Sequence, residues 1–175
     1  MDLFTIGHST HSQELFLEIL KSFNIEVLVD VRSYPGSKFL PHFNKENMIK
    51  WVSENGIEYK HIKDLGGRRR KSIEDVSAFV AGWTHIAFKN YAAYTLTKEF
   101  ENALNSLIKI AKKQKVCIMC AESVPWKCHR LIISNSLFFK DINVFHIMGK
   151  NKFIEHKINK FGAKAEFDGK KVIYP

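Results

Sequence analysis

Short apolar runs alternate along this chain with segments that have helical periodicity. Five runs have the length and residue pattern of β-strands: residues 3–7, 26–31, 57–62, 116–120 and 142–148. Between most of them, apolar residues recur three or four positions apart, as on the buried face of a helix. Strands that alternate with helices form a parallel or mostly parallel sheet. We therefore expect a three-layer α/β fold, Rossmann-like, with helices on both faces of the sheet.

Several helix boundaries can be predicted from capping residues. Thr10, with Gln13 three residues later, fits a capping box at the start of the first helix. Asn44 can cap a second helix in the same way. Residues 73–94 are rich in aromatic side chains and predict short helices packed beside the sheet.

The C-terminal tail, residues 150–175, differs in character from the rest of the chain. It contains seven lysines against three acidic residues. Asp168–Gly169 between two short apolar runs predicts a β-hairpin. The tail also predicts one more short amphipathic helix, through the spacing of Phe153, Ile154, Ile158 and Phe161.

Length and composition indicate one domain over residues 1–175, located in the cytoplasm. The chain is long enough to bury a full core, and no apolar run approaches the roughly 20 residues that span a bilayer. We therefore expect no membrane partner. Three cysteines are too few for a disulfide scaffold and favour a reducing compartment. The net charge of +9 favours phosphorylated or polyanionic partners, or it is simply a solvated basic surface.

Val116–Cys120 is followed within ten residues by an unusual set of reactive side chains. The run is apolar, Pro125 breaks it, and helical spacing resumes at Arg130. The unit is therefore a strand, a tight loop and a helix. Between the strand end and that helix lie two thiols, a carboxylate, an imidazole and a guanidinium: Cys120, Glu122, Cys128, His129 and Arg130. Packing alone does not require this combination, so we interpret it as a functional site.

Polar residues also follow the other predicted strands. In α/β folds, ligands bind at the carboxyl ends of the parallel strands. We therefore expect these residues to meet Cys120 and Glu122 at one rim of the sheet and to bind substrate: Gly7, His8, Ser9, Asp30, Arg32, Gly66 and Gly67. Ser9 and Thr10 have the alternative of capping the first helix, which is the commoner role of such residues.

The leading hypothesis is an enzyme, a hydrolase or a transferase, that acts on a phosphorylated substrate, a nucleotide or a nucleic acid. Glu122 is the candidate acid–base, because a carboxylate near His129 and Arg130 can be held in orientation. Arg32 and Arg130 are candidate anion clamps. Asp30–Arg32 and Glu122–Arg130 can alternatively form structural ion pairs. No Walker loop or complete G-x-G-x-x-G fingerprint is present, so no cofactor is indicated.

The cysteines allow a second set of interpretations. A thiol at Cys128 lies near a helix start, His129 and Arg130, which favour the thiolate as a nucleophile. Cys120 is the other candidate, whereas Cys117 is expected to be a buried hydrophobe. One alternative is a redox or zinc-binding protein that uses Cys120, Cys128 and His129. Their spacing matches no standard zinc pattern, so the leading hypothesis includes no metal. Another alternative is a non-catalytic nucleic-acid-binding module based on the basic loop and tail.

Four motifs occur together in this chain: Thr5–Ser9, Leu28–Pro35, Leu65–Gly67, and Cys120–Glu122 with Cys128–Arg130. Together they resemble the domain-of-unknown-function family 488, over about residues 3–148. The resemblance implies a single α/β domain in which these motifs cluster, and it implies no established activity. It adds Ser33 and Pro35 to the candidate binding residues. The lysine-rich tail lies outside the resemblance.

Overall fold

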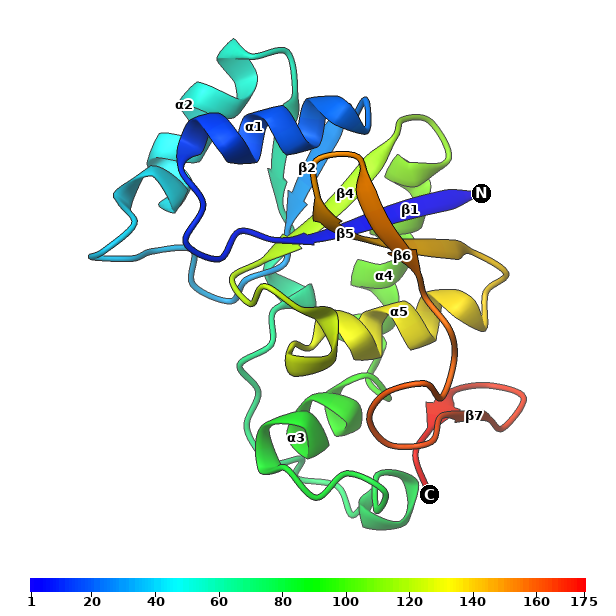
Figure 1. Cartoon of the computed structure of the whole chain (residues 1–175). Helices are drawn as coiled ribbons and strands as arrows, with labels where there is room; N and C mark the ends of the chain where they lie inside the picture. Colours follow the sequence, from blue (N-terminus) through cyan, green and yellow to red (C-terminus); the bar gives the residue numbers. More distant parts are fainter.

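The computed structural model describes all residues, 1–175, and its centre is a six-stranded sheet (Figure 1). The strands are β1 Asp2–Gly7, β2 Val27–Asp30, β3 Glu58–His61, β4 Val116–Cys120, β5 Asn143–Gly149 and β6 Lys152–Glu155. They lie in the order β3–β2–β4–β1–β5–β6. Strands β1 to β5 pair in parallel, and β6 pairs antiparallel with β5. The predicted α/β fold with a mostly parallel sheet is confirmed.

Helices cover both faces of this sheet (Figure 1). The helices are α1 Gln13–Ser22, α2 Lys45–Glu54, α3 Ile86–Tyr94, α4 Lys98–Ala111 and α5 Arg130–Phe138. Helices α1 and α2 pack on one face, and α4 and α5 pack on the other. Side chains alternate along β4. Cys117 therefore lies in the core beneath α1 and α2, and Cys120 lies in the opposite core, beneath α4 and α5. None of these helices combines the length and apolar character needed to cross a bilayer.

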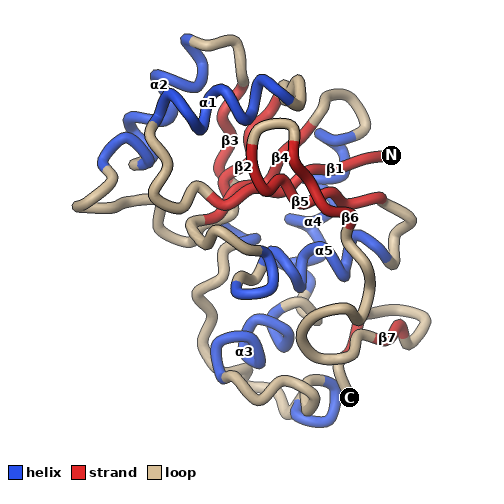
Figure 2. Tube along the Cα trace, viewed as in Figure 1, coloured by secondary structure: helices blue, strands red, loops and turns tan.

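Residues 62–97 connect β3 to α4 outside the sheet. In Figure 2 much of this segment is an extended loop, interrupted by 3₁₀ turns at Lys63–Leu65 and Ser77–Phe79 and by α3. The predicted short helices are therefore confirmed. Tyr91 of α3 is fully buried, and its hydroxyl donates to the carbonyl of Leu65 at 2.7 Å. This bond fixes α3 against the loop that carries Gly66 and Gly67.

The starts of α1 and α2 differ from the sequence prediction. Helix α1 is capped by Ser12, whose hydroxyl accepts from the amide of Leu15 at 3.1 Å, so the Thr10 capping box is wrong. Thr10 instead lines the cavity described below. Asn44 does occupy the N-cap position of α2, but its side chain accepts from the amide of Ser37 and caps no helical N–H.

The predicted C-terminal helix around Phe153–Phe161 is wrong. The chain reverses after β5 at Asn151, which has a φ of 54°, and pairs β6 with the open edge of β5. That edge offers unpaired backbone groups, and pairing them there outweighs the weak helical spacing of the tail. The hairpin around Asp168–Gly169 is confirmed as strands β7 Glu166–Phe167 and β8 Val172–Ile173.

Candidate active site

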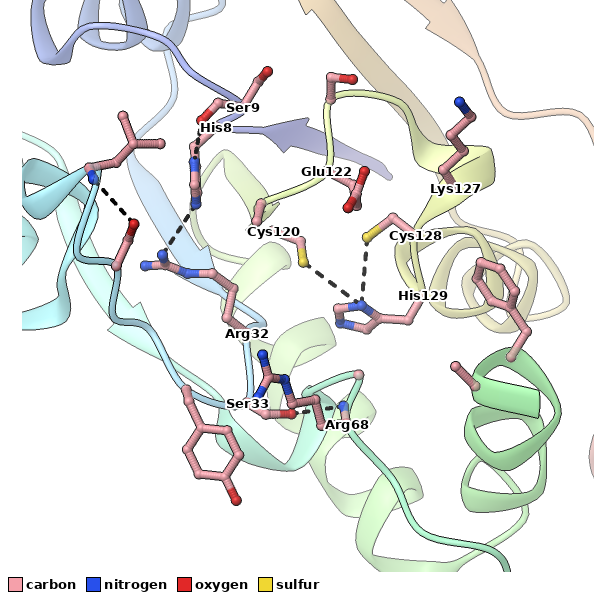
Figure 3. A pocket seen from close by; sticks show the side chains of 18 of the residues that line it. His8, Ser9, Arg32, Ser33, Arg68, Cys120, Glu122, Lys127, Cys128 and His129 are labelled. Carbon is pink, nitrogen blue, oxygen red and sulfur yellow. Dashed lines mark hydrogen bonds between the residues drawn. The ribbon is translucent and has the colours of Figure 1, made fainter. Parts of the chain in front are cut away.

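A cavity of about 930 Å³ lies where β1, β2 and β4 end (Figure 3). Its walls come from the segments that follow these strands, from the Gly67–Arg68 loop and from the start of α3. These segments are far apart in the sequence and meet because parallel strands present their carboxyl ends on one side of a sheet. Many of the sequence-predicted residues line this cavity: His8, Ser9, Arg32, Ser33, Gly67, Cys120, Glu122, Cys128 and His129.

Cys120, Cys128 and His129 form the centre of the cavity wall, and we call them the cysteine–histidine cluster. One ligand atom from each lies within 4.8 Å of the others. The Nδ1 atom of His129 is 3.8 Å from the sulfur of Cys120 and 3.6 Å from that of Cys128 (Figure 3). The three residues that the sequence groups together therefore lie side by side at the cavity wall.

The orientation of the His129 ring is set by the backbone. Its Nε2 lies 2.9 Å from the carbonyl oxygen of Val31. A carbonyl only accepts, so Nε2 carries a hydrogen, and in the neutral ring Nδ1 presents its lone pair to the two sulfurs. The ring edge also packs against Tyr91, with 5.0 Å between ring centroids. The imidazole is thus fixed with its basic nitrogen toward the thiols.

The two thiols of the cluster differ in acidity. Burial disfavours the Cys128 thiolate, but the hydrogen bond from Cys120 and the positive charge of Arg130 lower the pKa of Cys128 well below its ordinary value. The hydrogen bond to Cys128, together with burial, raises the pKa of Cys120. Cys128 is therefore the more acidic of the two thiols. Cys117 lies in the opposite core, where burial raises its pKa, as expected of a structural cysteine.

Arg32 is held by an ion pair and is not free to clamp an anion with its whole guanidinium group. Its Nη2 lies 2.6 Å from Oδ2 of Asp30 and donates to the carbonyl of Phe43 at 2.7 Å. Asp30 is fully buried and does not line the cavity. The geometry matches the alternative interpretation of this pair as a structural ion pair that braces the loop after β2.

His8 faces the cavity as a neutral imidazole. Its Nδ1 donates to the carbonyl of Ser9 at 2.8 Å, and its Nε2 lies 3.2 Å from Nη1 of Arg32. Burial lowers the pKa of His8 to about 4, against the opposing effect of the bond to Ser9. The ring stacks on Phe43 at 4.2 Å between centroids. Both ring nitrogens are therefore already used, and His8 shapes the wall of the cavity.

Arg130 points into the protein and does not line the cavity. Its side chain is 1% exposed and donates to the Glu122 carbonyl, to Oγ1 of Thr5 at 3.3 Å, and to the sulfur of Cys128 at 3.4 Å. The sequence suggested an anion clamp, but these contacts leave it no free face. Arg130 instead supports the sulfur of Cys128 and ties the loop after β4 to β1.

The glycines of the motifs allow close approach between loops. A Cβ atom at Gly7 would lie 1.7 Å from the carbonyl oxygen of Glu122, one at Gly66 would lie 2.4 Å from Oγ of Ser33, and one at Gly67 would lie 2.6 Å from Nδ1 of His129. Gly7, Gly66 and Pro35 do not line the cavity. The carbonyl of Pro35 accepts from the amide of Lys45, at the start of α2.

Glu122 is the only carboxylate that lines the cavity. The residue is exposed and its side chain forms no ion pair, so the expected bracing by His129 and Arg130 is absent. A free carboxylate in this position can still accept or donate a proton to a bound molecule.

Two exposed cations of the cavity wall were not among the predicted site residues. Arg68 and Lys127 both line the cavity, and neither pairs with an acidic side chain. Arg68 is placed by its backbone amide, which donates to Oγ of Ser33 at 3.0 Å. The signal for Arg68 was its position directly after Gly66–Gly67. The only sequence signal for Lys127 was its position directly before Cys128.

The basic tail does not contribute to the cavity. Three of its lysines pair with acidic residues: Lys150 with Glu18, Lys164 with Glu166, and Lys171 with Glu101. Three of the seven lysines in the tail are thus paired with acidic side chains of the same protein.

Comparison with known proteins gives a family but no characterised relative. No curated protein and no solved structure gives a significant match to this chain. The family model described as "Domain of unknown function DUF488" matches residues 12–137, which include the whole cysteine–histidine cluster and leave out the Thr5–Ser9 motif. Because the match covers most of the chain, the family prediction is confirmed: the chain belongs to the DUF488 family.

Proposed function

We propose that this protein is an enzyme that acts on a phosphorylated substrate of nucleotide size, bound in the cavity at the carboxyl rim of the sheet. The observation that carries the proposal is that the cysteine–histidine cluster and two unpaired cations, Arg68 and Lys127, face the same cavity. Reactive groups beside free cations are an arrangement that suits group transfer to or hydrolysis of a phosphorylated compound.

The charge of the cavity supports an anionic ligand. Arg68 and Lys127 are opposed there only by Glu122, because the charge of Arg32 is balanced by Asp30. The net charge of +9 on the whole protein also attracts anions. The volume of about 930 Å³ lies in the upper part of the range typical of ligand-binding pockets, which is large enough for a nucleotide.

Each part of the wall has a separate task in this proposal. Arg68 and Lys127 bind the phosphate, and the cysteine–histidine cluster is the reactive centre. Glu122 transfers a proton once a bound substrate excludes water from its carboxylate. Arg130 positions the sulfur of Cys128 and does not touch the substrate.

Thermal unfolding in the presence of phosphorylated compounds tests the proposal. The probes are inorganic phosphate, nucleoside phosphates, sugar phosphates and short oligonucleotides. A ligand at about 100 times its dissociation constant adds roughly 2.7 kcal/mol of stability, which corresponds to a rise of about 5–10 °C for a chain of this size. A compound that produces this shift is then assayed for turnover.

Two substitutions locate the binding site. Arg68→Ala and Lys127→Ala should each weaken binding about tenfold or more, because each removes a charge-assisted bond worth roughly 1.5–3 kcal/mol. Arg70→Ala is the matched control, since Arg70 is exposed in the same loop but does not line the cavity. Failure of every phosphorylated compound to shift the transition, or a shift that survives both substitutions, would refute the proposal.

A further inference from the structure

We propose that Cys120, Cys128 and His129 bind one zinc ion, with the fourth coordination position open to the cavity. Metal binding itself is independent of the activity proposed above. Only the role of the metal in catalysis rests on that proposed function.

The spacing of the three ligand atoms fits a tetrahedral zinc site. Zinc bonds of about 2.3 Å to sulfur and about 2.0 Å to nitrogen, at tetrahedral angles, place the sulfur and nitrogen ligands about 3.6 Å apart. Nδ1 of His129 lies 3.6 Å from the sulfur of Cys128 and 3.8 Å from that of Cys120. All three atoms lie within 4.8 Å of one another, so small side-chain adjustments complete the geometry.

The surroundings of the ligands match those of a metal-binding histidine and thiolate. Metal-bound histidines usually donate their second ring N–H to a carbonyl or carboxylate, as Nε2 of His129 does to Val31 at 2.9 Å. The backbone amide and Nε of Arg130 both donate to the sulfur of Cys128, at 3.5 and 3.4 Å. These bonds hold two of the three ligands in place whether or not a metal is bound.

Gly67 packs directly against the His129 ring. A Cβ atom at this position would lie 2.6 Å from Nδ1, 2.8 Å from Cγ and 3.0 Å from Cε1 of His129, against the face of the ring. The loop that carries Gly67 is itself held by Tyr91 through Leu65, at 2.7 Å. The glycine therefore allows the His129 ring to hold the orientation in which Nδ1 faces the two sulfurs.

The donor set favours zinc and indicates a catalytic site. Two sulfurs and one imidazole suit zinc, whereas calcium and magnesium prefer oxygen ligands. Structural zinc sites usually have four protein ligands, but catalytic sites have three and bind water or substrate in the fourth position. All three ligands line the same cavity as Arg68 and Lys127. A phosphorylated molecule bound by these cations would therefore lie next to the open position.

Metal analysis of the full-length protein tests the inference. Protein purified without chelator and with a reductant should contain one zinc per chain by elemental analysis. Replacement by Co²⁺ should produce the thiolate-to-cobalt charge-transfer absorption that reports sulfur ligation. Cys120 and Cys128 should react with an alkylating reagent much faster after zinc is removed, because metal-bound thiolates are shielded.

Substitutions assign the ligands. Cys120→Ser, Cys128→Ser and His129→Ala should each lose stoichiometric zinc and the cobalt absorption. Cys117→Ser is the matched control and should keep both, because Cys117 lies in the opposite core. Circular dichroism verifies that each variant folds. If one variant does not fold, the zinc content of the other two tests the ligand assignment.

Three results would overturn the inference. The first is protein that contains no zinc and takes up neither zinc nor cobalt. The second is retention of full zinc by the folded cluster variants. The third is a Cys120–Cys128 disulfide in the protein as isolated, detected as the loss of two hydrogens by mass spectrometry. Zinc binding without any response to phosphorylated compounds would refute only the proposed function, and a response without zinc would refute only this inference.

Discussion

Two groups of histidines and polar side chains lie on either side of Arg130, one facing the cavity and one inside the protein. Arg130 donates to the sulfur of Cys128 on one side and to Oγ1 of Thr5 on the other, at 3.4 and 3.3 Å. Beyond Thr5 begins a row of hydrogen bonds that we call the buried histidine chain: Thr5, His146, His156, Asn135 and Tyr174.

Every ring nitrogen of the buried histidine chain is already bonded. Thr5 donates to Nδ1 of His146 at 2.8 Å, Nε2 of His146 donates to Nδ1 of His156 at 3.1 Å, and Nε2 of His156 donates to Oδ1 of Asn135 at 3.0 Å. The amide of Asn135 then donates to the hydroxyl of Tyr174 at 3.1 Å. Assigning the Asn135 oxygen and nitrogen in this way gives each group one partner of the opposite kind.

The comparison shows why residue type alone does not identify a reactive site. In the buried histidine chain each buried polar side-chain atom has a partner and none of its residues lines the 930 Å³ cavity, so these hydrogen bonds stabilise the fold. In the cysteine–histidine cluster, Nδ1 of His129 faces two sulfurs at weak-bond distances and a cavity lies in front of them. The cluster retains bonding capacity that a metal or substrate can use.

The largest difference between the two regions should be in catalysis. Cys128→Ser should reduce turnover of the substrate found by ligand screening by roughly 10³-fold or more, about 4 kcal/mol of transition-state stabilisation. Its circular dichroism spectrum should remain that of the native fold. Turnover within tenfold of the unmodified protein would remove Cys128 from the reactive centre.

Glu122→Gln should have a smaller catalytic effect. The change removes the only carboxylate in the cavity while keeping its size, so turnover should fall about 10²-fold, the low end of acid–base contributions. Stability should change by less than about 0.5 kcal/mol, because the side chain forms no ion pair. Turnover measurements test the first expectation and urea unfolding tests the second. Unchanged turnover would exclude Glu122 from the chemistry.

His156→Leu should destabilise the protein by about 2 kcal/mol. The substitution leaves a donor on His146 and an acceptor on Asn135 buried without partners. Urea unfolding measures the loss, and zinc content should not change. Lys157→Ala, at the neighbouring exposed position, should have almost no effect. Equal stability of the two variants would show that the buried histidine chain contributes nothing to the fold.

Acid should weaken the fold through the same histidines. Burial lowers the pKa of His146 to about 3, with help from the charges of His156 and Arg130, and lowers that of His156 to about 4. The unfolded chain binds these protons near its ordinary pKa of about 6.5, whereas the folded protein does not. Stability is therefore fully present above about pH 6.5 and falls as the pH drops toward about 4.

The slope of that loss follows from the number of buried neutral histidines. It should reach up to about 1.4 kcal/mol per pH unit for each buried histidine. His8, whose pKa is also about 4, contributes in the same window. Urea unfolding between about pH 7 and about pH 4.5 measures the slope, and His156→Leu should reduce it. A stability that is constant over this range would contradict the neutral assignment of these rings.

Much of the fold was accessible from local patterns, whereas several boundaries were not. Alternating strands and helices predict the sheet, and period-two alternation places Cys117 and Cys120 in opposite cores, as observed. The start of α1 at Ser12 and the strand β6 depend on competing partners. A capping hydroxyl or a free strand edge is used only if the folded chain brings it to a suitable donor.

The candidate site divides in the same way. The sequence by itself determined that Cys120, Cys128 and His129 converge, because they flank one short loop after a strand whose end lies at the rim of the sheet. Only the tertiary structure decided the roles of the arginines. Asp30 and the Phe43 carbonyl occupy Arg32, Arg130 turns inward to Thr5 and Cys128, and Arg68 is left free at the cavity. The physical reason is that a guanidinium group bonds to the acceptors around it, and those acceptors come from segments that are distant in the sequence.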